Sequence, residues 1–142
     1  MNTIAQNNSA FDQSTPAAVQ DGLALGGRLL LSAIFVLSGV TKLGQAEGTI
    51  GYIASVGLPF AEPVYYAVVA LEIIGGILLV LGYKARSAAL ALGAFSVLAA
   101  VLFHSDLADQ NQMIHFLKNL ALAGGMLQVA AFGPGRLSLD RG

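Results

Sequence analysis

Residues 64–82 read VYYAVVALEIIGGILLVLG, an apolar run interrupted by one charged residue, Glu72. An α-helix rises about 1.5 Å per residue, and about 20 mostly apolar residues cross the hydrocarbon core of a bilayer. The run therefore predicts a membrane-spanning helix with a carboxyl group near its midpoint. A carboxyl group at that depth is energetically costly, so it needs a polar neighbour or a function.

Three other runs have comparable length and composition, at residues 23–43, 87–103 and 113–132. Together the four runs predict an all-α fold, an integral membrane four-helix bundle occupying residues 22–133. Polar residues at 1–21 predict a flexible N-terminal tail, and residues 134–142 form a short C-terminal tail. The alternating segments that a membrane β-barrel needs do not occur in the sequence.

The composition excludes several classes of protein. Charged residues make up 11% of the chain, whereas a soluble domain has about 25%. The net charge of -1 lacks the basic footprint of a nucleic-acid-binding protein. With no cysteine, the chain can form neither a disulfide nor a thiolate metal site.

The distribution of basic residues predicts the orientation in the membrane. One side of the four-helix arrangement carries Lys84, Arg86, Arg136 and Arg141. Because loops rich in Lys and Arg remain in the cytoplasm, we expect a multi-pass protein of the bacterial inner membrane with both termini cytoplasmic. On the other side, the connection at 44–62 is long enough for a short helix that lies on the membrane or enters the bundle mouth.

Ionisable residues inside the runs are the first candidates for function. Arg28, Glu72 and Lys118 lie within predicted spans, where such residues normally face the bundle interior. Both basic side chains are long enough to reach toward Glu72, so we expect one buried acid between two buried bases. Such a set serves either as an ion pair that fixes helix register or as a site for a head group or a proton.

Four more polar residues extend this candidate set. Lys42 is expected at the outer boundary with its ammonium group at the interface, and Asn119 lies beside Lys118. His104 and His115 approach each other if the third and fourth spans are neighbours. Two histidines without a third ligand do not predict a metal site. The sequence also lacks a nucleophile–base pair, a phosphate loop and a dinucleotide fingerprint, so no cofactor is evident from the chain.

Several short motifs follow one another in a specific order. They are Gly27-Arg28, Phe35-x-x-Ser38-Gly39-x-x-Lys42-Leu43, Gly57-x-Pro59, Glu72-x-x-Gly75-Gly76-x-x-Leu79-x-x-Gly82, Arg86, and Lys118-Asn119-Leu120-Ala121-x-x-Gly124-Gly125. In this order and spacing the chain resembles the DoxX family of small bacterial membrane proteins, from about residue 26 to residue 132. The polar N-terminal extension is not part of the family pattern.

The resemblance implies a four-helix membrane bundle. Relatives in the family are linked to quinone-coupled sulfur oxidation, to oxidative-stress complexes or to resistance against quinones and catechols. The residues that match the polar positions of the family are Arg28, Lys42, Glu72, Lys118 and Asn119.

Two functions follow as hypotheses. In the first, the chain is a quinone-interacting membrane subunit in which Lys118 and Arg28 donate to the quinone oxygens and Glu72 relays a proton. Since the chain shows no redox motif, electrons must then come from a partner oxidoreductase, and the chain is at most one subunit of an oxidoreductase. In the second, the chain is a non-catalytic scaffold or small-solute carrier. A pore would require a homo-oligomer, because four short helices leave little room for a lumen.

Overall fold

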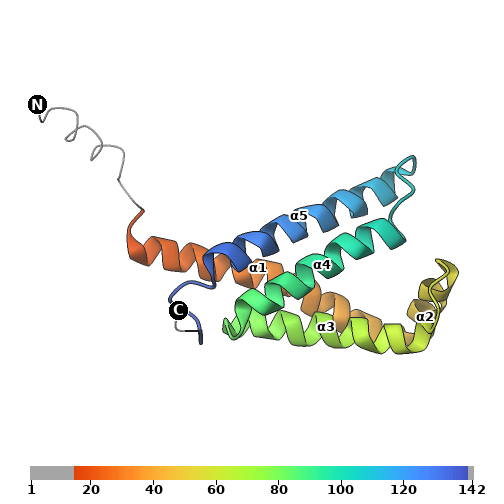
Figure 1. The fold of residues 1–142 in the computed structure, drawn as a ribbon, viewed down its shortest axis with the longest axis horizontal. Coiled ribbons are helices and arrows are strands. Elements are labelled where there is room, and N and C mark those ends of the chain that lie inside the picture. The colour runs from red at the N-terminus through yellow and green to blue at the C-terminus, as the bar shows by residue number, and fades with distance from the viewer. Residues whose placement is uncertain (1–14, 141–142) are drawn as a thin grey trace, which may run out of the picture.

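The computed structural model describes residues 15–140, so residues 1–14 of the predicted polar tail, and Arg141, lie outside it. Within this range the chain forms helices and no strands (Figure 1), which confirms the all-α prediction. The helices are α1 (Ala17–Gly44), α2 (Ala46–Ser55), α3 (Ala61–Leu81), α4 (Ala85–Phe103) and α5 (Gln110–Phe132). The predicted four-helix bundle differs from the five helices observed. The additional helix is α2, in the 44–62 connection, where the sequence left room for a short helix.

Three of the described helices, α1, α3 and α4, are long and apolar enough to cross a membrane. The chain is therefore an all-α membrane protein. Helix α5 is long enough, but its first half carries His115, Lys118 and Asn119, and it does not belong to this set. That residues 113–132 cross the membrane therefore stays a prediction. Helix α1 begins at Ala17, six residues before the predicted apolar run, so residues 17–21 of the predicted tail are helical.

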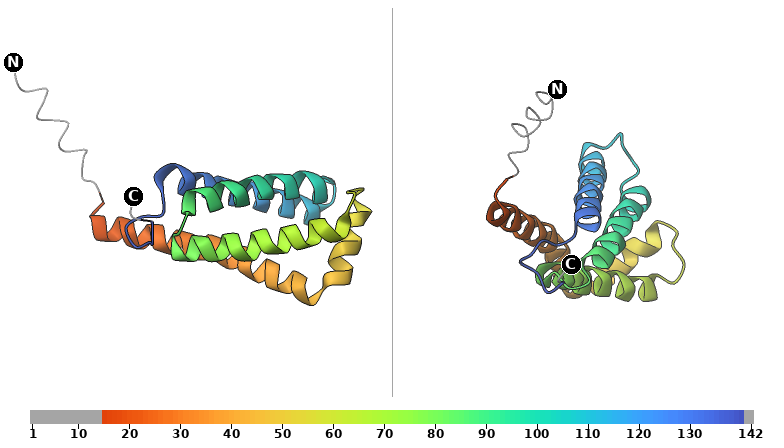
Figure 2. Two further views of the ribbon diagram at one scale, coloured as in Figure 1. Left: turned by 60° about the horizontal axis from the view of Figure 1, so that its bottom comes forward. Right: turned by 60° about the vertical axis from the view of Figure 1, so that its left-hand side comes forward.

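The long helices pack as two pairs. Helix α1 lies along α3 and α4 lies along α5, while α3 and α4 join the pairs and α1 touches α5 at few points. Figure 2 shows α4 and α5 as one layer over α1 and α3. The buried centre between the pairs consists of Phe35, Leu79, Ala88, Ala89, Leu92 and Met126.

Glycines let the helices approach closely at the centre. A Cβ atom on Gly76 would lie 2.6 Å from Val36 Cγ2 of α1, and one on Gly75 would lie 3.1 Å from Leu92 of α4. Small residues at such crossings are typical of membrane helices. Gly125 is similarly close to Leu31, whereas Gly124 faces open space.

The C-terminal segment, residues 133–140, closes one end of the bundle. It runs back over the α3–α4 turn, where the Leu139 N–H donates to Leu81 O at 3.0 Å. The carboxylate of Asp140 accepts the N–H groups of Lys84 and Ala85, each at 2.8 Å. Since the first N–H groups of a helix lack partners within the helix, Asp140 caps α4.

Candidate functional site

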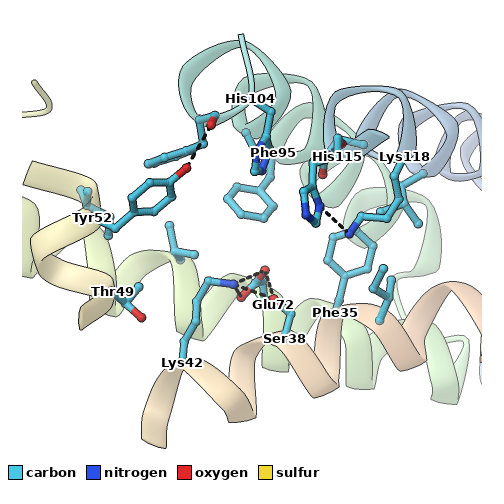
Figure 3. Close-up of a pocket in the computed structure, with 17 residues that line it drawn as sticks. Phe35, Ser38, Lys42, Thr49, Tyr52, Glu72, Phe95, His104, His115 and Lys118 are labelled. Carbon is cyan, nitrogen blue, oxygen red and sulfur yellow. Dashed lines mark hydrogen bonds and ion pairs between the residues drawn. The ribbon is translucent and has the colours of Figure 1, made fainter. Parts of the chain in front are cut away.

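The opposite end of the molecule contains a cavity of about 240 Å³ (Figure 3). All five helices contribute to its walls, so it lies where the two helix pairs and α2 meet. Its lining residues are Ile34, Phe35, Ser38, Lys42, Thr49, Tyr52, Ile53, Val68, Glu72, Phe95, Ala99, Phe103, His104, His115, Lys118, Asn119 and Leu122.

Glu72 is the centre of one polar wall. Glu72 is 3% exposed. Its Oε2 and Oε1 atoms lie 2.9 and 3.1 Å from the ammonium group of Lys42. Ser38 Oγ donates to Oε1 at 3.1 Å and accepts from Lys42 Nζ at 2.6 Å. In residues 15–140 this is the one salt bridge between side chains. The carboxyl group therefore accepts hydrogen bonds from an ammonium group and from a hydroxyl group.

Local sequence explains why α1 delivers both partners to Glu72. Ser38 and Lys42 are four residues apart and share a helix face. Gly39 lies between them, and a Cβ atom there would lie 2.6 Å from Ile73 Cγ1 and 3.3 Å from Glu72 Cβ. The glycine thus allows the close approach that brings the two side chains to the carboxylate.

Two stacked imidazole rings form the other polar wall. The rings of His104 and His115 have centroids 4.9 Å apart and an interplanar angle of 24°. His104 Nδ1 is 2.9 Å from Gln112 Oε1, and His115 Nδ1 is 3.1 Å from Lys118 Nζ. Asn119 Nδ2 donates to His115 O at 2.9 Å. This wall is a connected set of groups that can donate hydrogen bonds or hold protons.

Aromatic residues flank the space between the two polar walls. In Figure 3 the Phe95 ring lies beside the histidine pair, and the Phe35 ring lies on the other side of the space, near Lys118. At the rim, Tyr52 of α2 donates from its hydroxyl to Phe103 O at 3.0 Å, and the two rings are 5.4 Å apart. The cavity therefore has polar ends, an apolar middle and a short helix at its edge.

Arg28 is the one predicted site residue that does not line this cavity. Its guanidinium donates to the carbonyls of Leu79 at 2.8 Å, Val80 at 3.2 Å and Leu137 at the closed end. The expectation that Arg28 reaches toward Glu72 is wrong. The last carbonyls of α3 carry partial negative charge and accept hydrogen bonds from the guanidinium instead; Leu79 O also accepts the Gly82 N–H at 3.1 Å.

The predicted partner of Glu72 also differs from the observed one. Lys118 lines the same cavity but is hydrogen-bonded to His115, and Lys42, expected at the interface, forms the ion pair. The sequence did not predict Ser38, Tyr52 or Gln112 as contributors. The sequence did contain a signal for Ser38, because it lies four residues before Lys42 and therefore on the same face of α1.

The arrangement limits the chemistry of a ligand. In the part of the chain from 15 to 140, no three His, Cys, Asp or Glu side chains converge to hold a metal ion. The walls instead suit a small flat molecule with polar atoms at opposite edges. Pockets for drug-sized ligands measure about 300–1,000 Å³, so this cavity suits a single ring.

Comparisons with known proteins agree with the fold and the location in a membrane. The sequence model of the DoxX family matches residues 23–105. The chain is 36% identical over 124 residues to "Inner membrane protein YqjF" of Escherichia coli (strain K12), which covers 87% of this chain and 93% of that protein. It is 35% identical over 130 residues to "Inner membrane protein YphA" of the same organism, covering 87% and 92%.

A third relative matches only part of the chain. It is "Putative oxidoreductase CatD" of Bacillus subtilis (strain 168), 37% identical over 59 residues, which is 42% of each protein. No solved structure matches the chain.

Proposed function

The chain belongs to the DoxX family of membrane proteins, and from this premise we propose that its cavity binds the ring of a quinone or quinol for a partner oxidoreductase. The observation that carries the proposal is the pair of polar walls on either side of an aromatic middle. The Lys42–Glu72 pair forms one wall and the His104–His115 stack with Lys118 forms the other.

The ring would lie between Phe35 and Phe95, with its two oxygen-bearing edges toward the polar walls. Lys42 and Lys118 supply ammonium donors, one at each wall. Arg28, which satisfies backbone carbonyls at the far end, has no part in this site. A site with a few placed polar groups in an apolar cavity is the usual form of a small-molecule site.

Residues at both walls can hold protons. A quinone takes up two electrons and two protons when it becomes a quinol. Glu72 can hold one proton on a carboxylate oxygen, and His115 can hold another on its imidazole ring, because both lie at the cavity surface. The electrons come from a partner, since the sequence carries no redox motif; the name of CatD agrees with such a role.

The location follows from the relatives and from the charges. Both Escherichia coli relatives are named as inner membrane proteins. Lys84, Arg86 and Arg136 lie at the closed end, so the positive-inside rule assigns this end to the cytoplasm. The cavity then lies toward the periplasmic side.

One observation favours a second function. Both oxygens of Glu72 already have a partner within the protein, which is what a pair that only locks α1 to α3 requires. In that case the chain is a non-catalytic scaffold or a carrier of small solutes.

A binding experiment separates the two functions. The protein is extracted with its native lipids, and bound quinone is quantified by mass spectrometry for the wild type, Glu72→Gln and Lys118→Met. Hydrogen bonds to charged groups contribute about 1.5–3 kcal/mol, so each variant should lose at least about tenfold in affinity while remaining folded.

Gly124→Ala is the control, because a Cβ atom there meets nothing within 4 Å. It should retain quinone like the wild type. Full retention in a folded Glu72→Gln variant would refute the quinone site. Absence of quinone from the wild type, with Glu72→Gln lowering only stability, would establish the scaffold.

A further inference from the structure

The closed end of the bundle has a broad open hollow of about 940 Å³. It forms because the chain turns back sharply after α5, with positive φ angles at Gly133 and Gly135. Its lining residues are Arg86, Phe132, Gly133, Pro134, Gly135, Arg136, Ser138, Leu139 and Asp140. The C-terminal segment and the start of α4 therefore build it together, and it is remote from the cavity at Glu72.

Two guanidinium groups belong to this hollow. Arg86 Nη1 donates to Ala130 O and Ala131 O, both at 3.0 Å, and this fixes the group beside the last turn of α5. A Cβ atom on Gly133 would lie 3.2 Å from Arg86 Nη2, so the turn passes directly over the guanidinium. Arg136 is exposed, and only its backbone N–H, not its side chain, donates to Asp21.

One carboxylate also lines the hollow, that of Asp140. Its two oxygens accept the N–H groups of Lys84 and Ala85 at the start of α4. The helix N-terminus, which carries about half a positive charge, offsets much of the charge of this carboxylate. The hollow therefore offers an anion two guanidinium groups against one carboxylate that is already occupied.

Large apolar side chains surround the same cations. Phe132 is 80% exposed and Leu139 is 62% exposed, and both line the hollow. Because Phe132 ends α5 and Leu139 lies beside the end of α3, these side chains lie where helices reach the bilayer boundary. A soluble anion would leave them in water, whereas a lipid would cover them with hydrocarbon.

We propose that this hollow binds an anionic phospholipid of the adjacent leaflet. Arg86 and Arg136 contact the phosphate, and the acyl chains lie against Phe132 and Leu139. Guanidinium groups suit this role because they donate two parallel hydrogen bonds to a phosphate. Basic pockets at the cytoplasmic ends of membrane helices recognise anionic head groups in the same way.

The test measures lipid retained by the full chain in bilayers of phosphatidylcholine with phosphatidylglycerol as minor component. Native mass spectrometry compares the wild type with Arg136→Gln, which removes a guanidinium that makes no hydrogen bond or salt bridge within residues 15–140. A basic residue near a membrane surface contributes about 1 kcal/mol, so retention of phosphatidylglycerol should fall about fivefold.

Lys84→Gln is the matched control, because it removes the same charge at the same end outside the hollow. Its ammonium group lies 5.7 Å from the centroid of the Tyr83 ring. This variant should retain phosphatidylglycerol like the wild type. An equal loss in both variants would show general surface attraction and overturn the proposal.

Two further outcomes would also overturn it. Retention of phosphatidylglycerol without preference over phosphatidylcholine would mean that the guanidinium groups do not select a charged lipid. Displacement of the lipid by inorganic phosphate would assign the hollow to a soluble anion.

Discussion

Helix α1 places one basic side chain in the protein at each end of the bundle, and the two have different kinds of hydrogen-bond partner. Arg28 at the closed end donates to backbone carbonyls of α3 and the C-terminal segment. Lys42 at the cavity end pairs with the carboxylate of Glu72. Arg28 is 1% exposed, whereas the Lys42 side chain is 26% exposed beside an open space.

The difference separates a cation bound to backbone carbonyls from a cation paired with a carboxyl group at the wall of a cavity. Backbone carbonyls cannot change charge, so the contacts of Arg28 are fixed once the chain has folded. A carboxylate can bind a proton, and a neighbouring cavity allows a ligand to compete for the ammonium group. A buried basic residue in a membrane helix is therefore best interpreted from its partner, not from its depth.

Replacement of Arg28 should have the largest effect on folding. Arg28→Met leaves the carbonyls of Val80 and Leu137 without this donor, whereas Leu79 O keeps the Gly82 N–H at 3.1 Å. Each unsatisfied buried group costs about 1–3 kcal/mol, so the free energy of unfolding should fall by about 4 kcal/mol. Thermal unfolding in detergent micelles measures this, and Arg28→Lys, which keeps the charge but not the fork of donors, should lose less. A Met variant as stable as the wild type would refute the role of the guanidinium.

Replacement of Lys42 should have an intermediate effect that a second change reverses. Lys42→Met leaves the Glu72 carboxylate without its cation. Breaking a fully buried pair costs about 3–5 kcal/mol, and about 2 kcal/mol is expected here because the Lys42 side chain is 26% exposed. Lys42→Met combined with Glu72→Leu should recover most of this loss, since apolar residues can replace a buried pair.

The double variant also tests whether the Lys42–Glu72 pair, unlike Arg28 at the other end, belongs to a ligand site. If the pair is part of a ligand site, the double variant folds well but binds no quinone, which unfolding and binding measurements together would show. If it unfolds as easily as the single variant, the unpaired carboxylate is not the cause of the loss.

Much of the fold could be predicted because long apolar runs have few alternatives. Helical spacing also identified His104, Glu72, His115, Lys118 and Asn119, which share one cavity in the structure. Spacing of this kind places residues on one face of a helix, and antiparallel neighbours then bring such faces together.

The partners of the buried charges could not be predicted in the same way. Pairing of Lys42 with Glu72 depends on the axial offset between α1 and α3, which helical periodicity does not determine. The partners of Arg28 are carbonyl groups, which every residue possesses and which leave no sequence signal. One of them, Leu137 O, also depends on the return of residues 133–140, which the sequence indicated only as a tail.

The smallest predicted effect concerns α2, at the edge of the cavity. Tyr52→Phe removes the hydrogen bond to Phe103 O but keeps the ring contact, and the bond is exposed, so the cost is about 0.5 kcal/mol. Thermal unfolding should hardly change, whereas amide exchange in residues 46–55 should become about twofold faster. Tyr66→Phe, at an exposed tyrosine of α3, is the control and should leave that exchange unchanged. Unchanged exchange in Tyr52→Phe would mean that the packing of Ile53 against Tyr65 and Val69, and not the tyrosine hydrogen bond, holds α2 in place. The contacts at the cavity end would then be as fixed as those of Arg28 at the other end.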